Sequence, residues 1–229
     1  YHRFNSNVAR LAVAALVSVP SFLLISTWAY VDIALAFYAF GAFAIARRAV
    51  ESQDQRWFAL TGAFAGMAMG VKYTGGIVPI AIFLVLLRPF NLRWLVIYGF
   101  AGALVASPWY LRNYFFTGNP VFQFFFGGIY WDAFRANWFG RFGTGLLNEP
   151  LKLVLAPWDA TIYGVEGALG YEATIGMLLL ALVPLLLLPS PKLKAQSQKP
   201  EINHSEIRNP KSEISALFLF SATLYLFWL

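Results

Sequence analysis

The chain has 229 residues, of which 59% are hydrophobic and 12% are charged, and its mean hydropathy is +0.60. Soluble domains contain about 45–50% apolar and about 25% charged residues, so this composition excludes an ordinary soluble fold and predicts an integral membrane protein. The net charge is +6, but the basic residues lie in short segments between apolar runs, where positive charge normally sets membrane orientation, so we expect no nucleic-acid partner. The absence of cysteine excludes disulfides, thiolate metal sites and a cysteine nucleophile.

Apolar runs follow one another along the chain, and several are shorter than the roughly 20 residues that span a bilayer. They are Leu11–Ser26, Tyr30–Ala46, Trp57–Val71, Thr74–Leu87, Leu92–Ser107, Ala173–Leu188 and Ser215–Leu229. A continuous helix over Leu11–Ala46 or Trp57–Leu87 would be about 45–55 Å long, well beyond a hydrocarbon core of about 30 Å. The pattern therefore predicts hairpins of short helices in an all-α, polytopic transmembrane bundle that lies among membrane lipids.

The basic residues predict the orientation of this bundle. If each run crosses the membrane once, most of the 17 basic residues lie on one side, which the positive-inside tendency assigns to the cytoplasm. This topology brings Asp32, Lys72 and Arg112 together at the outer face. The inner face receives Arg47, Arg48, Arg88 and Arg93.

Two long connections complete the single transmembrane domain over residues 1–229. The outer loop, residues 110–172, contains aromatic residues at helical spacing in Tyr130–Phe142, which predicts an interfacial helix, and Pro150–Pro157 could form a second one. The polar segment 190–214 reads as a flexible inside loop. Tyr1 is not an initiator and the last run is short, so we expect the chain to be a fragment with missing spans on both sides.

Three glycines mark one face of the run Trp57–Val71. Gly62, Gly66 and Gly70 recur every four residues, a small-residue stripe that lets another helix backbone approach closely. The stripe predicts helix packing.

Asp32 and Lys72 each lie at the end of an apolar run, where ionisable side chains are costly and therefore usually functional. As a purely structural alternative, Asp32 could stabilise a helix start and Lys72 could anchor a helix end in the lipid headgroups. As a functional group, Asp32 could bind a divalent metal ion or orient a neighbouring cation or a substrate hydroxyl. Lys72, in the glycine-flanked connection 70–76, offers a compact charge for phosphate.

Arg112 follows the run that ends at Ser107, and its planar guanidinium matches the oxygens of a phosphate. Asn113 adds an amide, and Thr117–Pro120 is a turn signal. Alternatively, Arg112 pairs with lipid headgroups or with Asp32. Further residues that could line a substrate cleft are Tyr73, Trp109, Tyr110 and Asp132.

In their order along the chain, these motifs resemble a known family. The strings Trp28–Asp32, Gly70–Thr74 and Ser107–Asn113, followed by Thr117–Pro120, are similar to the middle of GT-C-type membrane glycosyltransferases. The nearest group would be the bacterial aminoarabinose transferases and the protein O-mannosyltransferase-like enzymes. The resemblance covers roughly residues 8–190.

The resemblance implies an enzyme that moves a sugar from a polyprenyl-phosphate donor to a lipid, glycan or protein acceptor. The reaction would take place on the extracytoplasmic side of the plasma (inner) membrane. Asp32 matches the family's acidic residue of the second outer loop, which makes it a catalytic or metal-binding candidate, and Lys72 matches a lysine near the donor phosphate. Arg112 would be a further phosphate-binding cation. The family's principal catalytic carboxylate lies in the first outer loop, N-terminal to this chain, so we expect the chain alone to be inactive.

A polytopic transporter or lipid flippase is the alternative function. Such a protein also carries charges within the membrane, but its ionisable residues should approach the bilayer midplane rather than gather at one face. The position of Asp32 and Lys72 within their helices distinguishes the two.

Overall fold

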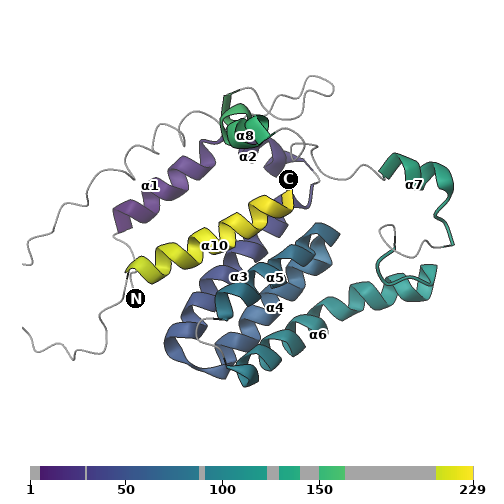
Figure 1. The fold of residues 1–229 in the computed structure, drawn as a ribbon, viewed down its shortest axis with the longest axis horizontal. Coiled ribbons are helices and arrows are strands. Elements are labelled where there is room, and N and C mark those ends of the chain that lie inside the picture. Colours follow the sequence, from purple (N-terminus) through teal and green to yellow (C-terminus); the bar gives the residue numbers. More distant parts are fainter. Residues whose placement is uncertain are drawn as a thin grey trace, which may run out of the picture. The chain divides into compact units, whose positions relative to one another are not determined.

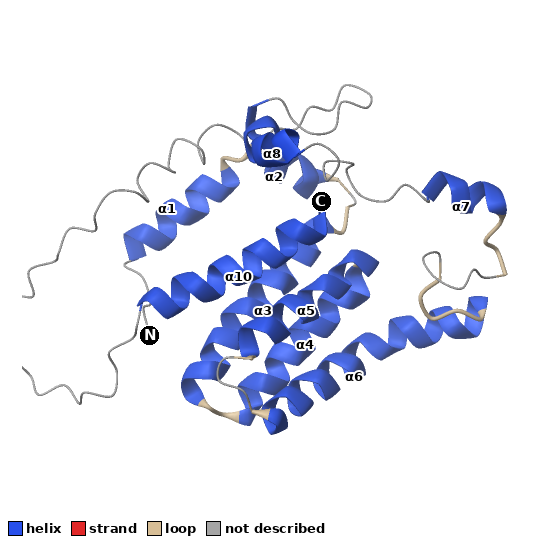
Figure 2. Ribbon diagram, viewed as in Figure 1, coloured by secondary structure: helices blue, strands red, loops and turns tan. Residues whose placement is uncertain are grey.

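The computed structural model describes residues 6–28, 30–87, 91–122, 129–139, 150–162 and 210–228, and within these ranges every regular element is a helix (Figure 2). The predicted all-α class is confirmed. Helices α3 (Asp32–Ser52) and α6 (Leu92–Thr117) are long and apolar enough to cross a membrane, and the bent pair α1–α2 could form a third span. The chain divides into two compact units, Tyr1–Tyr30 with Glu149–Pro210 and Val31–Asn148 with Lys211–Leu229.

The first unit contains α1 (Ser6–Val17), α2 (Pro20–Thr27) and α8 (Pro150–Ile162). The apolar run Leu11–Ser26 is divided between two helices, because α1 and α2 are bent by 69° at a break between them. Pro20 lacks a backbone N–H and disfavours the helical conformation of the residue before it, and Val19 accordingly has an extended backbone, with ψ 117°. Pro150 begins a helix, as predicted, and this helix continues to Ile162.

The second unit is built around α4 (Gln55–Val71), which packs against α3 and α6 (Figure 1). A short 3₁₀ turn, η1 (Tyr73–Gly76), and α5 (Ile77–Leu86) follow, so Trp57–Leu87 forms two helices rather than one, as predicted. The break is at Lys72, whose extended backbone ends α4. The Tyr98 hydroxyl of α6 donates to the Pro79 carbonyl at 2.8 Å, which fixes α5 beside α6. The helix connections are capped by side chains, since Asp54 and Asn91 accept backbone N–H groups at the starts of α4 and α6.

The glycine stripe of α4 is a close helix crossing, as predicted, but only over part of its length. A Cβ atom at Gly62 or Gly66 would collide with the backbone of α6 at Tyr98 and Gly102. At Gly70 a Cβ atom would meet nothing within 4 Å. The two helices therefore touch at their backbones in the middle of α4, and space opens between them near its C-terminal end.

Helix α6 is longer than the run Leu92–Ser107 that was predicted, because it continues through Pro108 to Thr117. Proline removes the N–H that would bond the carbonyl four residues earlier, that of Leu104. The Ser107 hydroxyl donates to this same carbonyl at 2.8 Å and replaces the missing bond. The helix then ends at the predicted turn, where Gly118 adopts φ 76°. Residues 110–117, predicted as the start of the outer loop, are therefore helical.

Parts of the outer loop and of the C-terminal region also differ from expectation. Helix α7 (Ala133–Phe139) begins later than the predicted start at Tyr130, because the Asp132 carboxylate caps it by accepting the Arg135 N–H at 2.8 Å. Residues 140–142, the rest of the predicted helix, lie outside the described residues. Helix α10 (Pro210–Trp228) begins within the polar segment 190–214 and packs on α3 through stacked Phe220 and Phe43 rings. The rest of that segment and the run Ala173–Leu188 lie outside the described residues.

The second unit has two chemically different ends, separated by the length of α4, which is about 25 Å for its 17 residues. At its N-terminal end, Arg93 donates to the Gln55 side chain at 3.1 Å and the Arg48 guanidinium lies 5.8 Å from the Trp57 ring. Arg47 is adjacent to Arg48 on α3, and Arg88 lies outside the described residues. Asp32 and Lys72 lie at the other end, which we call the ion-pair end.

Candidate functional site

The ion-pair end is defined by an ion pair between two helices. The Lys72 ammonium lies 2.9 Å from Asp32 Oδ1 and donates a hydrogen bond to it. Asp32 is in the first turn of α3, where the helix dipole favours a carboxylate, and Lys72 is the residue that ends α4. Both side chains are about half exposed, at 41% and 44%. The sequence predicted that these two charges converge at one face, and the structure brings them into direct contact.

The backbone around Lys72 holds its side chain at this position. Lys72 has φ −155° and ψ 145°, so the chain leaves the helix there and enters η1. The Lys72 carbonyl accepts the Gly75 N–H at 2.8 Å, which closes the turn. A Cβ atom at Gly75 would collide with the Ala68 carbonyl of α4, so only glycine lets this turn fold back so closely. The glycine-flanked connection recognised in the sequence is therefore a tight reversal that presents Lys72.

Tyr73 links this turn to α6. The Asn113 side-chain amide donates to the Tyr73 hydroxyl at 2.6 Å. The Tyr110 ring meets the Tyr73 ring edge-on, with centroids 6.2 Å apart. Burial raises the pKa of the Tyr73 phenol, and the hydrogen bonds with Trp109 and Asn113 oppose this shift. The phenol is therefore protonated at neutral pH.

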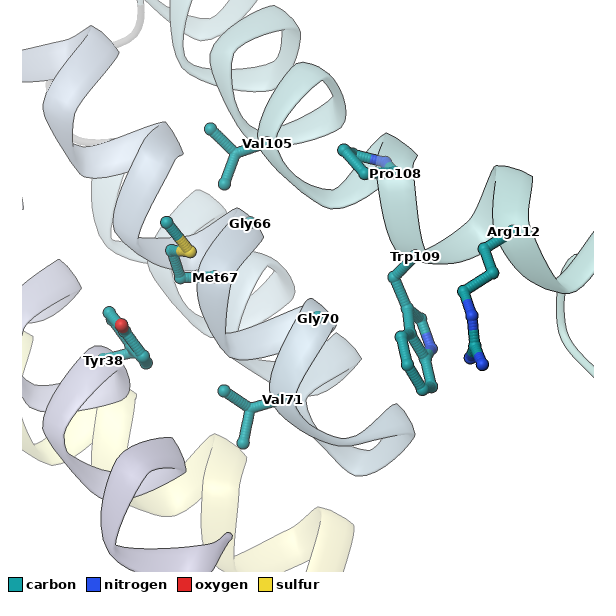
Figure 3. A pocket seen from close by; sticks show the side chains of 9 residues that line it. All are labelled: Tyr38, Gly66, Met67, Gly70, Val71, Val105, Pro108, Trp109 and Arg112. Carbon is teal, nitrogen blue, oxygen red and sulfur yellow. The ribbon is translucent and has the colours of Figure 1, made fainter.

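Arg112 lies one residue before Asn113 and lines a pocket between α3, α4 and α6. Its guanidinium stacks 5.5 Å from the Trp109 ring centroid and 5.6 Å from that of Phe116. The pocket has a volume of about 430 Å³. Figure 3 shows the Trp109 and Arg112 side chains extending from α6 side by side, with Gly70 and Val71 of α4 nearby. The remaining lining residues are Tyr38, Gly66, Met67, Val105 and Pro108.

The pocket lining is apolar except for Arg112 and the hydroxyl of Tyr38. Arg112 itself is exposed, and none of the described residues forms an ion pair with it. Its donors are therefore available to an anion, while the two aromatic rings hold the guanidinium by contacts worth about 0.5–1 kcal/mol each at exposed sites. The arrangement fits an amphiphile with an anionic head beside Arg112 and an apolar part in the pocket.

The described residues do not fit a divalent metal ion at Asp32. Within the described ranges, no group of three or more histidine, aspartate or glutamate side chains gathers. The described partner of the Asp32 carboxylate is the Lys72 ammonium, which repels a second cation. We therefore derive no metal-dependent step.

The predicted site residues fall into two groups. Most of them lie at the ion-pair end: Asp32, Lys72, Tyr73, Trp109, Tyr110, Arg112 and Asn113. Asp132 makes its described contacts within its own segment, where it pairs with Arg135 at 2.6 Å and caps α7. Arg112 does not pair with Asp32, which was one of the two structural alternatives for that arginine, the other being lipid headgroups.

The sequence reasoning missed the pocket wall. Tyr38, Met67 and Val105 are aromatic or apolar residues inside helices, and nothing in their pattern separates a pocket wall from a packed core. Gly70 could have been recognised as a pocket residue, because a glycine at the end of a stripe, next to a turn, can border open space instead of a packed helix.

No curated protein and no solved structure matches the chain. Residues 2–111 match the family model described as dolichyl-phosphate-mannose-protein mannosyltransferase. The matched stretch contains Asp32, Lys72 and Tyr73 and ends directly before Arg112. The chain is therefore similar to this family over slightly less than half of its length.

Proposed function

We propose that the ion-pair end binds the phosphate of a polyprenyl-phosphate sugar, and that the complete protein transfers this sugar to a hydroxyl of a lipid, glycan or protein acceptor. The observation that carries the proposal is that Arg112 lines an apolar pocket and directly precedes Asn113, which bonds Tyr73 in the turn after Lys72. The matched family description names a dolichyl-phosphate sugar as donor, which supports this substrate class.

The two cations suit a phosphate in different ways. Arg112 offers a planar fork of donors that can bind two phosphate oxygens, and its aromatic neighbours orient that fork. Lys72 offers a compact charge, and Asp32 holds its ammonium in one place. Asp32 is then a positioning residue, since its carboxylate is already engaged by Lys72.

The pocket supports an isoprenoid chain as the apolar part of the donor. Its volume of about 430 Å³ is within the range of small-molecule pockets, roughly 300–1,000 Å³. Met67, Val71 and Val105 provide aliphatic walls, and the missing side chain of Gly70 leaves room between α4 and α6. A branched hydrocarbon chain would bury apolar surface there at about 25 cal/mol per Å².

The reaction would break the bond between the sugar C1 and the phosphate oxygen and form a bond between C1 and the acceptor oxygen. The electron pair of the broken bond stays on the phosphate, whose growing negative charge Lys72 and Arg112 would stabilise. The acceptor proton passes to a general base. We do not assign that role to Asp32, because the Lys72 ammonium already contacts its carboxylate at 2.9 Å.

The charges also support one side of the membrane. Arg47, Arg48, Arg56 and Arg93 lie toward the opposite end of the unit, where positive residues favour the cytoplasm. The ion-pair end would then face the extracytoplasmic side of the plasma (inner) membrane. Asp32 and Lys72 lie at helix ends rather than in mid-helix, which favours an enzyme acting at the membrane face over a transporter with a midplane site.

Donor selectivity tests this proposal. The full-length protein is reconstituted in liposomes and supplied with a labelled sugar either as a polyprenyl phosphate or as a nucleotide sugar, together with extracted membrane lipid and a peptide or glycan acceptor. We expect a labelled product from the lipid-phosphate donor alone. Label transfer from the nucleotide sugar alone would overturn the proposal, and so would movement of the intact lipid donor across the bilayer without any transferred sugar.

A further inference from the structure

The Tyr73 hydroxyl is held by a side chain from α6. The Asn113 side-chain amide donates to it at 2.6 Å. The Asn113 side chain is buried, at 8% exposure, although the residues on either side of it are exposed.

This contact lies where α4 and α6 no longer touch at their backbones. The helices are in close contact at Gly62, Gly66 and Gly102, but a Cβ atom at Gly70 would meet nothing within 4 Å. At this level the pocket separates the helices. The bond between Asn113 and Tyr73 therefore bridges the open end of the α4–α6 pair.

The bridge also joins the two cations through their immediate neighbours in sequence. Tyr73 directly follows Lys72, whose backbone is fixed by the η1 turn, and Asn113 directly follows Arg112. Trp109, one of the two rings on which Arg112 stacks, lies about one helical turn before Asn113. A change in the Tyr73 contact would therefore move Lys72 relative to Arg112.

We propose that Tyr73 and Asn113 are positioning residues that set the separation between Lys72 and Arg112, a role that rests on the proposed phosphate binding by these two cations. The phosphate is small, so both cations can reach it only if the open end of the α4–α6 pair keeps one spacing. The Tyr73 latch, defined as Tyr73 with Asn113, fixes that spacing before the donor binds.

The first test measures geometry and needs no activity. Spin labels are attached to cysteines replacing the exposed residues Thr74 and Tyr114 in the full-length protein, a design helped by the absence of native cysteine from this chain. We expect Tyr73→Phe and Asn113→Leu each to broaden the distance distribution between the labels. Tyr98→Phe is the matched control, because it removes a similar hydroxyl bond, to the Pro79 carbonyl at 2.8 Å, away from the site. Unchanged distributions in both latch variants would overturn the proposal.

The second test asks whether the spacing matters for the donor. A hydrogen bond contributes about 0.5–1.5 kcal/mol, so each latch variant should raise the KM for the lipid-phosphate sugar by about 2- to 13-fold. The KM for the acceptor and the donor KM of Tyr98→Phe should not change. If the latch acts by placing Lys72, Tyr73→Phe should have little further effect in a Lys72→Gln background, where a merely structural loss would add in full.

The outcomes separate this inference from the proposed function. An inactive full-length wild-type protein would overturn the proposed function. The spin-label distances would still test whether the Tyr73 latch fixes the spacing between α4 and α6. Broadened distances together with a wild-type donor KM, or with effects that add to Lys72→Gln, would overturn the positioning role.

Discussion

The Lys72 ammonium contacts the Asp32 carboxylate at 2.9 Å, although the two residues are 40 positions apart and belong to different helix ends. The contact joins the start of α3 to the end of α4. An exposed pair of this kind contributes only about 0–1 kcal/mol to stability, so its main effect is to restrict where the Lys72 ammonium lies.

Asp32→Asn should therefore lower sugar transfer without unfolding the protein. Asparagine keeps the size of the side chain and removes its charge, so the ammonium is held less tightly, and we expect a rate loss of up to about fivefold for about 1 kcal/mol. Transfer kinetics and thermal unfolding of the full-length variant measure the two effects. Asp54→Asn is the control, because Asp54 caps the opposite end of α4 and asparagine caps equally well. Equal activity of both variants would remove Asp32 from the site.

The glycine stripe should divide into a packing part and a tolerant part. Gly66→Ala places a methyl group against the Gly102 backbone, and overpacking of this kind typically costs about 1–3 kcal/mol. Gly70→Ala meets open space and gains helix propensity, so its stability should equal or slightly exceed that of the wild type. Unfolding in detergent, followed by circular dichroism, compares the two. Equal destabilisation by both substitutions would contradict the opening of the helices at Gly70.

Gly70→Leu should fill the pocket while leaving the cations in place. The new side chain would occupy space among Met67, Val71 and Val105, so a long isoprenoid donor should bind less well. A donor with the same phosphate sugar on a short alkyl chain should be affected much less. The measurement is the ratio of the KM values for the two donors. If Gly70→Leu leaves that ratio at the wild-type value, the donor chain does not enter this pocket.

Ser107 should stabilise α6 only because Pro108 follows it. Ser107→Ala leaves the Leu104 carbonyl without the hydroxyl that bonds it at 2.8 Å, which should cost about 1 kcal/mol. In a Pro108→Ala background the backbone N–H of residue 108 can bond this carbonyl, and the cost should largely vanish. A four-variant unfolding cycle measures the difference. Additive effects would show that the two residues act independently.

The sequence was most informative where charges interrupt apolar runs. Asp32 and Lys72 could be placed at one end of the bundle because hydropathy locates helix ends and positive charge orients them. Proline was ambiguous: Pro20 separates α1 from α2 at a 69° bend, whereas Pro108 lies inside α6. The difference depends on whether a side chain such as Ser107 replaces the lost bond, a tertiary detail that proline alone does not reveal.

The end of the bundle where the candidate residues lie was predicted in outline, but their contacts were not. Gly62, Gly66 and Gly70 have identical spacing, and only the path of α6 decides which of them packs and which borders a pocket. The hydrogen bond between Tyr73 and Asn113 likewise depends on α6 continuing past Pro108, which the predicted end at Ser107 did not include.

The charge dependence of donor use tests the central claim most directly. Lys72→Gln and Arg112→Gln each remove one cation from the phosphate, and a charged hydrogen bond is worth about 1.5–3 kcal/mol, so kcat/KM for the polyprenyl-phosphate sugar should fall by roughly 10- to 150-fold. Arg93→Gln is the matched control, because Arg93 is an exposed arginine at the other end of α6 and should leave kcat/KM near the wild-type value. Wild-type kcat/KM in folded Lys72→Gln and Arg112→Gln proteins would mean that these cations do not bind the donor phosphate.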